Sequence, residues 1–166
     1  MIFKGCAAKR CEGASCHVRR KEKVIVFKKM DHVGVSVKDI EKAIRFYRDV
    51  IGMEKTFDRE FDSPLAEIIG VDGARARIVH MKRGESVVEL FHYLSPTGRL
   101  PRPDQNQSDF GLTHIGFLVE DFEQTYLDLK QKGVTFLGKP VEIRPGVFVA
   151  YFRGVEHEIC EMREVR

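Results

Sequence analysis

The chain has 166 residues, of which 43% are hydrophobic and 32% charged, and this composition is ordinary for a soluble globular protein. No apolar run approaches the roughly 18–20 residues that a membrane span needs, and the cationic N-terminus lacks the apolar core of a signal peptide, so we expect a cytoplasmic protein with no membrane partner. Residues 1–30 carry nine Lys or Arg and two Glu, whereas the rest of the chain carries nineteen basic and twenty-three acidic groups, so the globular part is mildly acidic and nucleic acid is not expected as a partner.

Residues 1–29 form a basic, cysteine-containing extension that we expect to be poorly ordered. It contains Cys6, Cys11 and Cys16, followed directly by His17. These side chains are of the types that bind zinc, but the four-residue gaps between the cysteines are wider than the usual C-x2-C clip. Free thiols in a reducing compartment are the favoured interpretation.

A strand and a helix are predicted to open the first module, residues 30–93. In "MDHVGVSV", residues 30–37, His32, Gly34 and Ser36 alternate with three valines, which is the pattern of a strand with one buried face. Asp39 stands in an N-cap position, apolar residues follow at helical spacing, and Gly52 ends the predicted helix.

Further strands complete this module. "MEKTFDREF", residues 53–61, predicts a strand, and "SPLAEIIGV" predicts a short helix or loop. "ARARIVHMK" and "ESVVELFHY" predict a strand pair joined by a turn at Arg83–Gly84. The order is therefore β-α-β-β-β, and a linker with three prolines and two glycines follows at residues 94–111.

The second module, residues 112–165, repeats this order. "LTHIGFLV", residues 112–119, predicts a strand, and Asp121 caps a predicted helix that ends at Gly133. Later strands are predicted at residues 134–138, 141–146, 147–154 and 157–165. The internal repeat predicts a single α+β domain over residues 30–165, in which two modules lie side by side around a shared cleft.

Two histidines and two glutamates occupy matching places in the repeat. "DHVGVSVKDIEKAI" begins at Asp31 and "THIGFLVEDFEQTY" at Thr113, so each copy has a histidine second and a glycine two residues later. Glu89 in "VVELF" and Glu161 in "EICEM" lie in the last strand of each module, between apolar residues that point the other way.

A carboxylate within an apolar strand is costly to bury unless it is paired or bound to metal. If the face that carries each histidine is concave, the repeat brings His32, Glu89, His114 and Glu161 into the cleft. Two imidazoles and two carboxylates suit a divalent ion such as Ni, Co, Zn, Mn or Fe(II). A lone histidine or glutamate is usually only structural, and it is the matching positions that favour a metal site.

Other residues carry weaker signals. Phe91 shares the predicted cleft face with Glu89, whereas Cys160 points away from it, which argues against a nucleophilic role. His80, His92 and His157 have no counterpart in the repeat and are interpreted as surface or core residues. Arg99 and Arg102 in the linker are of a type that grips carboxylate or phosphate, but exposed loop arginines are mostly solvated.

The layout resembles the vicinal oxygen chelate superfamily, which includes glyoxalase I, methylmalonyl-CoA epimerase, extradiol dioxygenases and the fosfomycin and bleomycin resistance proteins. The resemblance covers roughly residues 30–165 and rests on "MDHVGVSVKDIEKAIRFYRDVIGM", "VVELFHY", "LTHIGFLVEDFEQTYLDLKQKGV" and "AYFRGVEHEICEMRE". It implies paired modules that form a half-open, barrel-like sheet around a metal ion, with His32, Glu89, His114 and Glu161 as ligands. Many relatives have "DPDGN" before the final acid, where this chain has "GVEHE".

The ligand set is most similar to that of glyoxalase I, whereas the epimerases usually have Gln in place of Glu89. The resemblance implies a metal-dependent lyase or isomerase in which the metal polarises a carbonyl and Glu161 or Glu89 moves the neighbouring proton through an enediolate. Glyoxalase-type isomerisation and epimerisation of an acyl-CoA both remain open. So do an Fe(II) dioxygenase and a non-catalytic protein that binds a small molecule. A homodimer is also expected by resemblance.

Overall fold

The computed structural model describes residues 27–99 and 107–166. Residues 31–166 form one compact unit, and the fold described below is that of this unit. Cys6, Cys11, Cys16, His17 and Arg102, which the sequence singled out, lie outside the described residues. Within the described ranges, no helix is long and apolar enough to cross a membrane.

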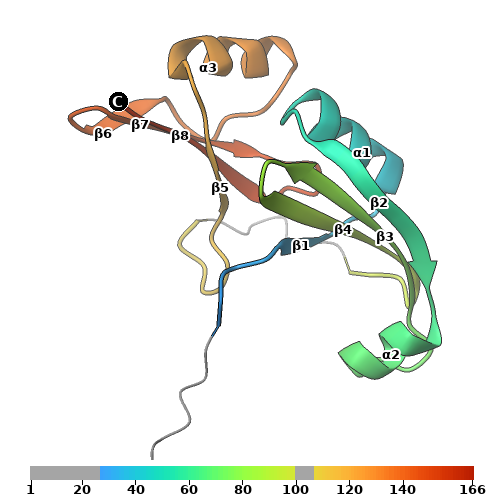
Figure 1. Ribbon diagram of the computed structural model, residues 1–166. Coiled ribbons are helices and arrows are strands. Elements are labelled where there is room, and N and C mark those ends of the chain that lie inside the picture. Colours follow the sequence, from blue (N-terminus) through green and yellow to red (C-terminus); the bar gives the residue numbers. More distant parts are fainter. Residues whose placement is uncertain (1–26, 100–106) are drawn as a thin grey trace, which may run out of the picture. The chain divides into compact units, whose positions relative to one another are not determined.

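Each module contributes one sheet (Figure 1). The first contains β1 (Val33–Ser36), α1 (Ile40–Asp49), β2 (Glu54–Phe61), α2 (Ser63–Ile69), β3 (Arg75–Arg83) and β4 (Ser86–Ser95). The second contains β5 (Ile115–Leu118), α3 (Phe122–Gln131), β6 (Val141–Arg144), β7 (Val147–Arg153) and β8 (Ile159–Val165).

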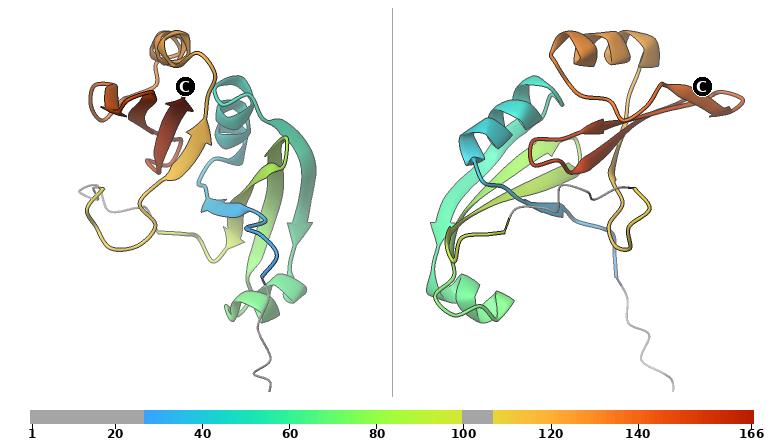
Figure 2. Two further views of the ribbon diagram at one scale, coloured as in Figure 1. Left: turned by 60° about the vertical axis from the view of Figure 1, so that its left-hand side comes forward. Right: turned by 180° about the vertical axis from the view of Figure 1, so that it is seen from behind.

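Both sheets have the same topology. Their strand orders are β1-β4-β3-β2 and β5-β8-β7-β6. In each, the first strand pairs in parallel with the last, and the other neighbours pair antiparallel. The two sheets are mixed, four-stranded and not closed into barrels, which confirms the predicted α+β fold of two repeated modules (Figure 2).

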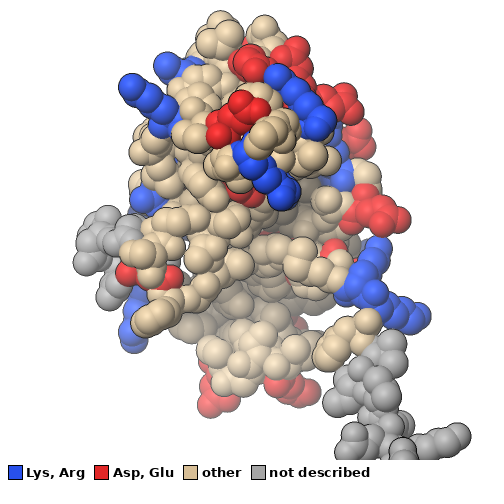
Figure 3. All heavy atoms as spheres, turned by 90° about the vertical axis from the view of Figure 1, so that its left-hand side faces the viewer, with Lys and Arg blue, Asp and Glu red and all other residues tan. Residues whose placement is uncertain are grey.

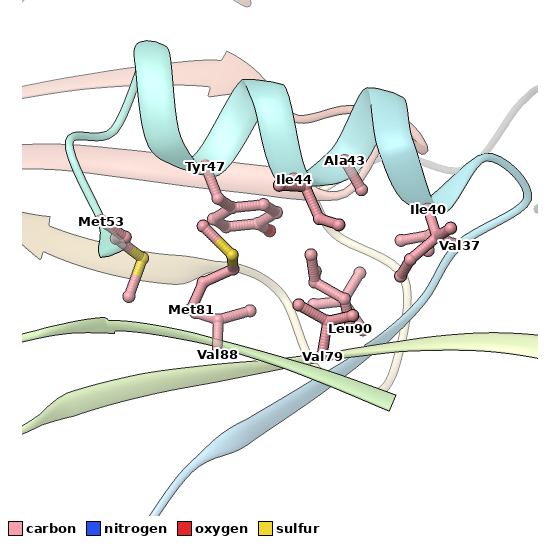
Figure 4. Close-up of a cluster of buried hydrophobic side chains, with 11 residues drawn as sticks. Val37, Ile40, Ala43, Ile44, Tyr47, Met53, Val79, Met81, Val88 and Leu90 are labelled. Carbon is pink, nitrogen blue, oxygen red and sulfur yellow. The ribbon is translucent and has the colours of Figure 1, made fainter. Parts of the chain in front are cut away.

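Helix α1 covers one face of the first sheet. The Asp39 side chain caps it by accepting a hydrogen bond from the backbone N–H of Lys42 at 2.9 Å, as the sequence predicted. Its apolar stripe, which includes Ile44 and Tyr47, packs on strand residues that alternate along β3 and β4 (Figure 4). The buried strand side chains in this cluster are Val79, Met81, Val88 and Leu90. Residues at the intervening positions of β3 and β4 therefore face away from α1.

The second module follows the same plan with one difference from prediction. Asp121 caps α3, and Phe122 and Leu129 of this helix are buried with residues of β7 and β8. The strand predicted at residues 134–138 is reduced to a single antiparallel bridge, between Phe136 and Phe152, flanked by backbone hydrogen bonds from Leu137 to Tyr151 and from Arg153 to Thr135. Pro140 lacks a backbone N–H and follows Gly138 closely, so pairing is interrupted until β6 begins at Val141.

A part-buried hydrogen bond joins the two modules. The Tyr47 hydroxyl of α1 donates to Oε1 of Glu158 at 2.9 Å, and Glu158 lies in the turn that precedes β8. Burial, together with the Glu158 carboxylate, raises the pKa of Tyr47 well above its usual value, so the hydroxyl keeps its proton and acts as a donor. The backbone N–H groups of Val155 and Glu156 also donate to the Glu158 carboxylate, at 3.2 and 2.8 Å.

This turn is the "GVEHE" segment. Gly154 lies so close to Glu158 that a Cβ atom in its place would be 2.2 Å from the carboxylate carbon, so a larger residue would displace the Glu158 side chain from its hydrogen bonds. His157 adopts a φ of 70°, a conformation that L-residues rarely take. The three hydrogen bonds to Glu158 hold the turn closed and thereby position the start of β8.

Replacing Tyr47 by Phe is expected to lower the free energy of unfolding by about 1–3 kcal/mol, because the part-buried Glu158 carboxylate loses one of its hydrogen bonds, that from the hydroxyl. Urea denaturation followed by circular dichroism measures the change. Glu158→Ala, which removes the acceptor, alone and combined with Tyr47→Phe, completes a double-mutant cycle. If Tyr47→Phe costs as much in the Glu158→Ala background as in the wild-type chain, the hydroxyl–carboxylate bond is not the source of the loss.

Candidate functional site

The first candidate pair, His32 and Glu89, lies on the face of the first sheet that α1 does not cover. Glu89 is aligned with Gly34 on β1 and with His80 on β3. Nε2 of His32 is 3.1 Å from Oε2 of Glu89, and Nε2 of His80 is 2.7 Å from Oε1 of the same carboxylate. The Glu89 side chain is only 15% exposed. Each oxygen of this carboxylate thus faces its own imidazole.

The second candidate pair, His114 and Glu161, has the same construction. Glu161 is aligned with Gly116 on β5 and with Tyr151 on β7. Nε2 of His114 is 3.6 Å from Oε2 of Glu161, and the Tyr151 hydroxyl donates to Oε1 at 3.2 Å. The Tyr151 and His114 rings also meet edge to face, with centroids 5.3 Å apart. Tyr151 therefore contacts both members of the pair, and partial burial and then the Glu161 charge raise its pKa.

The glycine two residues after each histidine leaves room for this arrangement. A Cβ atom at Gly116 would lie 3.1 Å from Oε2 of Glu161, closer than most such contacts. At Gly34 it would lie 3.5 Å from the Phe91 ring, which shares the face of Glu89 as predicted. The repeated H-x-G pattern thus places an imidazole directly before the strand and a residue without a side chain next to the carboxylate, so that nothing crowds the carboxylate.

The other ring nitrogen of each histidine also has a partner. Nδ1 of His32 is 3.1 Å from Oδ2 of Asp31. In the tautomer that carries its proton on Nδ1, the ring donates to this carboxylate and offers the Nε2 lone pair to a metal ion. Nδ1 of His114 is 3.0 Å from Oγ1 of Thr113. In both copies of the repeat, a polar residue immediately before the histidine orients its ring.

Gln107 is a further partner of His114. Its Nε2 is 3.1 Å from Nδ1 of His114, while its buried Oε1 has no hydrogen-bond partner among residues 27–99 and 107–166. A half-turn of the amide would place that oxygen against Nδ1, which would then carry the ring proton. His114 Nε2 would in turn become a metal donor, so the orphaned oxygen fits a histidine that binds a metal ion.

The spacing of the donors fits a divalent ion. Two ligands about 2.0–2.2 Å from one ion, in tetrahedral or octahedral geometry, lie about 3.0–3.5 Å apart. The 3.1 Å between His32 and Glu89 falls in this range, and the 3.6 Å between His114 and Glu161 is slightly beyond it. Each pair is therefore suited to provide two neighbouring ligands of one ion.

The structure brings the four candidates together two by two. In the described part of the chain, no group of three or more His, Cys, Asp or Glu side chains is placed so that it could hold a metal ion. The convergence of all four ligands at one ion stays a prediction.

Two cavities lie beside the histidine-bearing strands. One, of about 250 Å³, is lined by residues of both modules, among them Gly34, His114 and Arg153. The other, of about 690 Å³, lies where β1 and β4 end and includes Lys38 and Arg99 in its lining. The volume of the larger cavity lies within the size range of small-molecule sites, about 300–1,000 Å³, and the smaller one falls just below it.

Aromatic side chains extend the first pair's face into an apolar wall. Ile78 on β3 is buried there together with Leu65 of α2, and Phe57, Phe61, Phe91 and Tyr93 pack against them. Figure 3 shows, on one side of the molecule, basic and acidic side chains mixed together and a hollowed area lined mainly by uncharged residues. The aromatic wall suits the apolar part of a small molecule, and the mixed charges in Figure 3 form no continuous basic patch on that side.

Sequence reasoning missed two residues that contact the glutamates. His80 was interpreted as structural, although the predicted turn at Arg83–Gly84 aligns Arg83 with Ser86 and hence His80 with Glu89. Tyr151 offered no comparable signal. The connection between β7 and β8 has five residues, and a loop of that length does not predict which residue of β7 pairs with Glu161.

The other predicted side chains have ordinary surroundings. His92 lies on the opposite face of β4 from Glu89, with Nδ1 3.3 Å from the Val37 carbonyl oxygen. Cys160 is fully buried in the core, as expected, and burial raises the pKa of its thiol. His157 lines the smaller cavity.

The sequence and the fold were compared with known proteins. The chain is 26% identical to the mitochondrial methylmalonyl-CoA epimerase of Mus musculus over 125 residues, 73% of this chain and 65% of the relative. It is 33% identical to a 2-epi-5-epi-valiolone epimerase of Actinomyces sp over 121 residues, 69% of this chain and 65% of the relative. It thus spans slightly less than two thirds of the length of these curated relatives.

The fold resembles that of a glyoxalase family protein from Bacillus cereus, with a TM-score of 0.77 and 23% identity over 85% of this chain and 96% of that one. The family profile described as "Glyoxalase/Bleomycin resistance protein/Dioxygenase superfamily" matches residues 29–154. With this match, the repeated modules and the two His–Glu pairs on corresponding strands, the chain belongs to the glyoxalase/bleomycin resistance protein/dioxygenase superfamily.

Proposed function

We propose that this protein is a divalent-metal-dependent isomerase that removes a proton from the carbon beside a carbonyl group and returns a proton to the substrate. The observation that carries the proposal is the pair of matched His–Glu contacts, one in each module, with Oε2 of each glutamate facing Nε2 of its histidine. His32, Glu89, His114 and Glu161 would hold the ion. Ni, Co, Zn and Mn are the candidates, as is Fe(II) if the protein is a dioxygenase.

The glutamates are the proposed bases. Glu89 and Glu161 are both largely shielded, with 15% and 16% of their side chains exposed, so a carboxylate displaced from the ion can take a proton from a substrate in a site with little water. When bound, the ion supplies charge that polarises the substrate carbonyl. The electron pair left by the proton moves onto the carbonyl oxygen, and reprotonation of carbon restores the carbonyl.

The site of reprotonation distinguishes two reactions. Glyoxalase-type isomerisation returns the proton to the neighbouring carbon, whereas epimerisation delivers one to the opposite face of the same carbon. Both curated relatives named above are epimerases, and two carboxylates in equivalent modules could provide a base for each face, which favours epimerisation. Glu89, where the epimerases usually have Gln, instead favours the glyoxalase type. An acyl-CoA or another small molecule with an apolar part suits the aromatic wall beside Glu89.

The alternatives differ in what they require. An Fe(II) dioxygenase would use His32, His114 and Glu161 and would leave Glu89 off the metal. A non-catalytic protein would retain a small molecule with no need for the ion. The separation of the four ligands into two pairs also supports a homodimer, in which each pair meets the complementary pair of a second copy. The cytoplasmic location stays a prediction.

Metal content is the first test. Protein equilibrated with Ni, Co, Zn, Mn or Fe(II) in turn is expected to retain about one ion per chain by elemental analysis, because four ligands make one complete site. His32→Ala and His114→Ala are each expected to lose it, whereas the control His92→Gln, on the opposite face of β4, keeps it. Metal that persists in both alanine variants would point to Cys6, Cys11, Cys16 and His17 and contradict the assignment.

Proton exchange tests the chemistry. In deuterated water, wild-type protein is expected to introduce deuterium beside the carbonyl of methylmalonyl-CoA, or to isomerise the hemithioacetal of a 2-oxoaldehyde. Glu89→Gln and Glu161→Gln should each slow the reaction by about 100-fold or more, since a positioned base contributes that much. Glu60→Gln, on the exposed edge of β2, is the control. Oxygen uptake with catechols in place of exchange would support the dioxygenase instead.

Mixed chains test whether a site is shared between two copies. His32→Ala and His114→Ala chains, produced together with different tags and purified as heterodimers, are expected to regain one intact site per dimer, because the unchanged first module of one chain meets the unchanged second module of the other. If both pairs of one site come from a single chain, every mixed dimer stays inactive and metal-free. Homodimers of each variant serve as the baseline.

A further inference from the structure

The two glutamates share a feature beyond the histidines that face them. Each has one oxygen, Oε2, directed at the histidine from the first strand of its module, and the other, Oε1, in contact with the residue directly across the antiparallel strand pair. That neighbour is His80 for Glu89 and Tyr151 for Glu161. The chain therefore repeats this contact in both modules with two different side chains.

We propose that His80 and Tyr151 are positioning residues that hold Oε1 of Glu89 and Oε1 of Glu161, so that each glutamate presents only Oε2 to the metal ion. The inference rests on the proposed function, since it assigns a role toward the same ion. It concerns residues that touch the ligands and not the substrate.

The contact at Glu89 is short enough to require a proton. The 2.7 Å between Nε2 of His80 and Oε1 of Glu89 would be repulsive if two lone pairs faced each other, and it is typical of a nitrogen that carries hydrogen beside a carboxylate oxygen. His80 is itself held in place, because its ring packs on that of Phe57 from β2, with centroids 4.5 Å apart. A side chain fixed on two sides is suited to orient a third group.

The contact at Glu161 is a hydrogen bond from a group that keeps its proton. The Tyr151 hydroxyl donates to Oε1 of Glu161 at 3.2 Å, and a phenolic O–H is a donor at neutral pH. Its ring also contacts the His114 ring. Tyr151 thus fixes the carboxylate through its hydroxyl and the imidazole through its ring edge.

Holding one oxygen has a chemical consequence. The terminal torsion of a free glutamate is broad, so an unanchored carboxylate can turn and bind an ion through both oxygens. Bidentate binding by two glutamates would fill six positions together with two imidazoles and leave none for a substrate oxygen. Anchoring Oε1 limits each glutamate to one bond, which keeps positions open and leaves the glutamate easier to displace when it acts as a base.

The test compares metal affinity among variants that differ in one donor. His80→Phe keeps a ring beside Phe57 but removes the nitrogen, and Tyr151→Phe keeps the ring beside His114 but removes the hydroxyl. Competition with a coloured chelator for Zn or Ni is expected to show a 10–100-fold loss of affinity in each, the usual effect of removing a residue that orients a metal ligand. Tyr126→Phe is the control, because its ring packs on Phe136 in the α3 region.

His80→Gln separates positioning from direct ligation. The glutamine amide can donate to Oε1 but is a poor ligand for these ions, so affinity is expected to recover to within a few-fold of wild type. Failure of this variant to recover, while thermal melting in chelator shows an intact fold, would mean that His80 binds the ion itself and would overturn the proposed role. If a His80 variant does not fold, the metal affinity of Tyr151→Phe still tests the positioning role.

The outcomes separate this inference from the proposed function. Wild-type affinity in both phenylalanine variants would overturn the positioning role and leave the metal-dependent isomerase intact. A wild-type protein that takes up none of the ions would overturn both. Kinetics add a further readout, since a misdirected base should lower kcat more than it changes KM.

Discussion

The packing of α1 on the first sheet determines the orientation of every side chain on β4. Val88 and Leu90 are buried beneath the helix, so Glu89 between them must face the other way. Cys160 and Met162 are buried in the same manner in the second module and turn Glu161 outward. A slip of one residue would bury a carboxylate in an apolar core, which costs several kcal/mol, so the core enforces the register on which the site depends.

Small residues and one part-buried hydrogen bond complete this arrangement. Gly116 leaves space beside Glu161, and a side chain there would crowd the carboxylate. Tyr47 binds Glu158, three residues before Glu161, and so links the turn that begins β8 to the helix of the other module. The candidate ligands are therefore held by the core and the module junction, and little of their placement depends on loops. The two histidines are the exceptions, since each precedes its strand and is held by residues outside it, His32 by Asp31 and His114 by Gln107.

Much of this was predictable because it depends on local periodicity. Alternation placed His32 and Glu89 on one face, and the internal repeat did the same for His114 and Glu161. Residues 134–138 were predicted as a full strand but form only one bridge, since Gly138 and Pro140 interrupt the pairing. The contact of His80 with Glu89 was available from the short turn between β3 and β4, but its lack of a histidine counterpart in the second module concealed it.

The sequence by itself determined the two modules, their capped helices and the four candidate ligands. Strand and helix periods follow from neighbouring residues, and the repeat follows from comparing two segments of the chain. Only the tertiary structure decided that each glutamate has a second partner and that the candidate ligands meet in two pairs. Tyr151 reaches Glu161 through a register set by the turn at residues 154–158, and that turn is closed by Tyr47, 111 residues away from Glu158 in sequence. Contacts across such separations follow from how the modules pack, which no local pattern encodes.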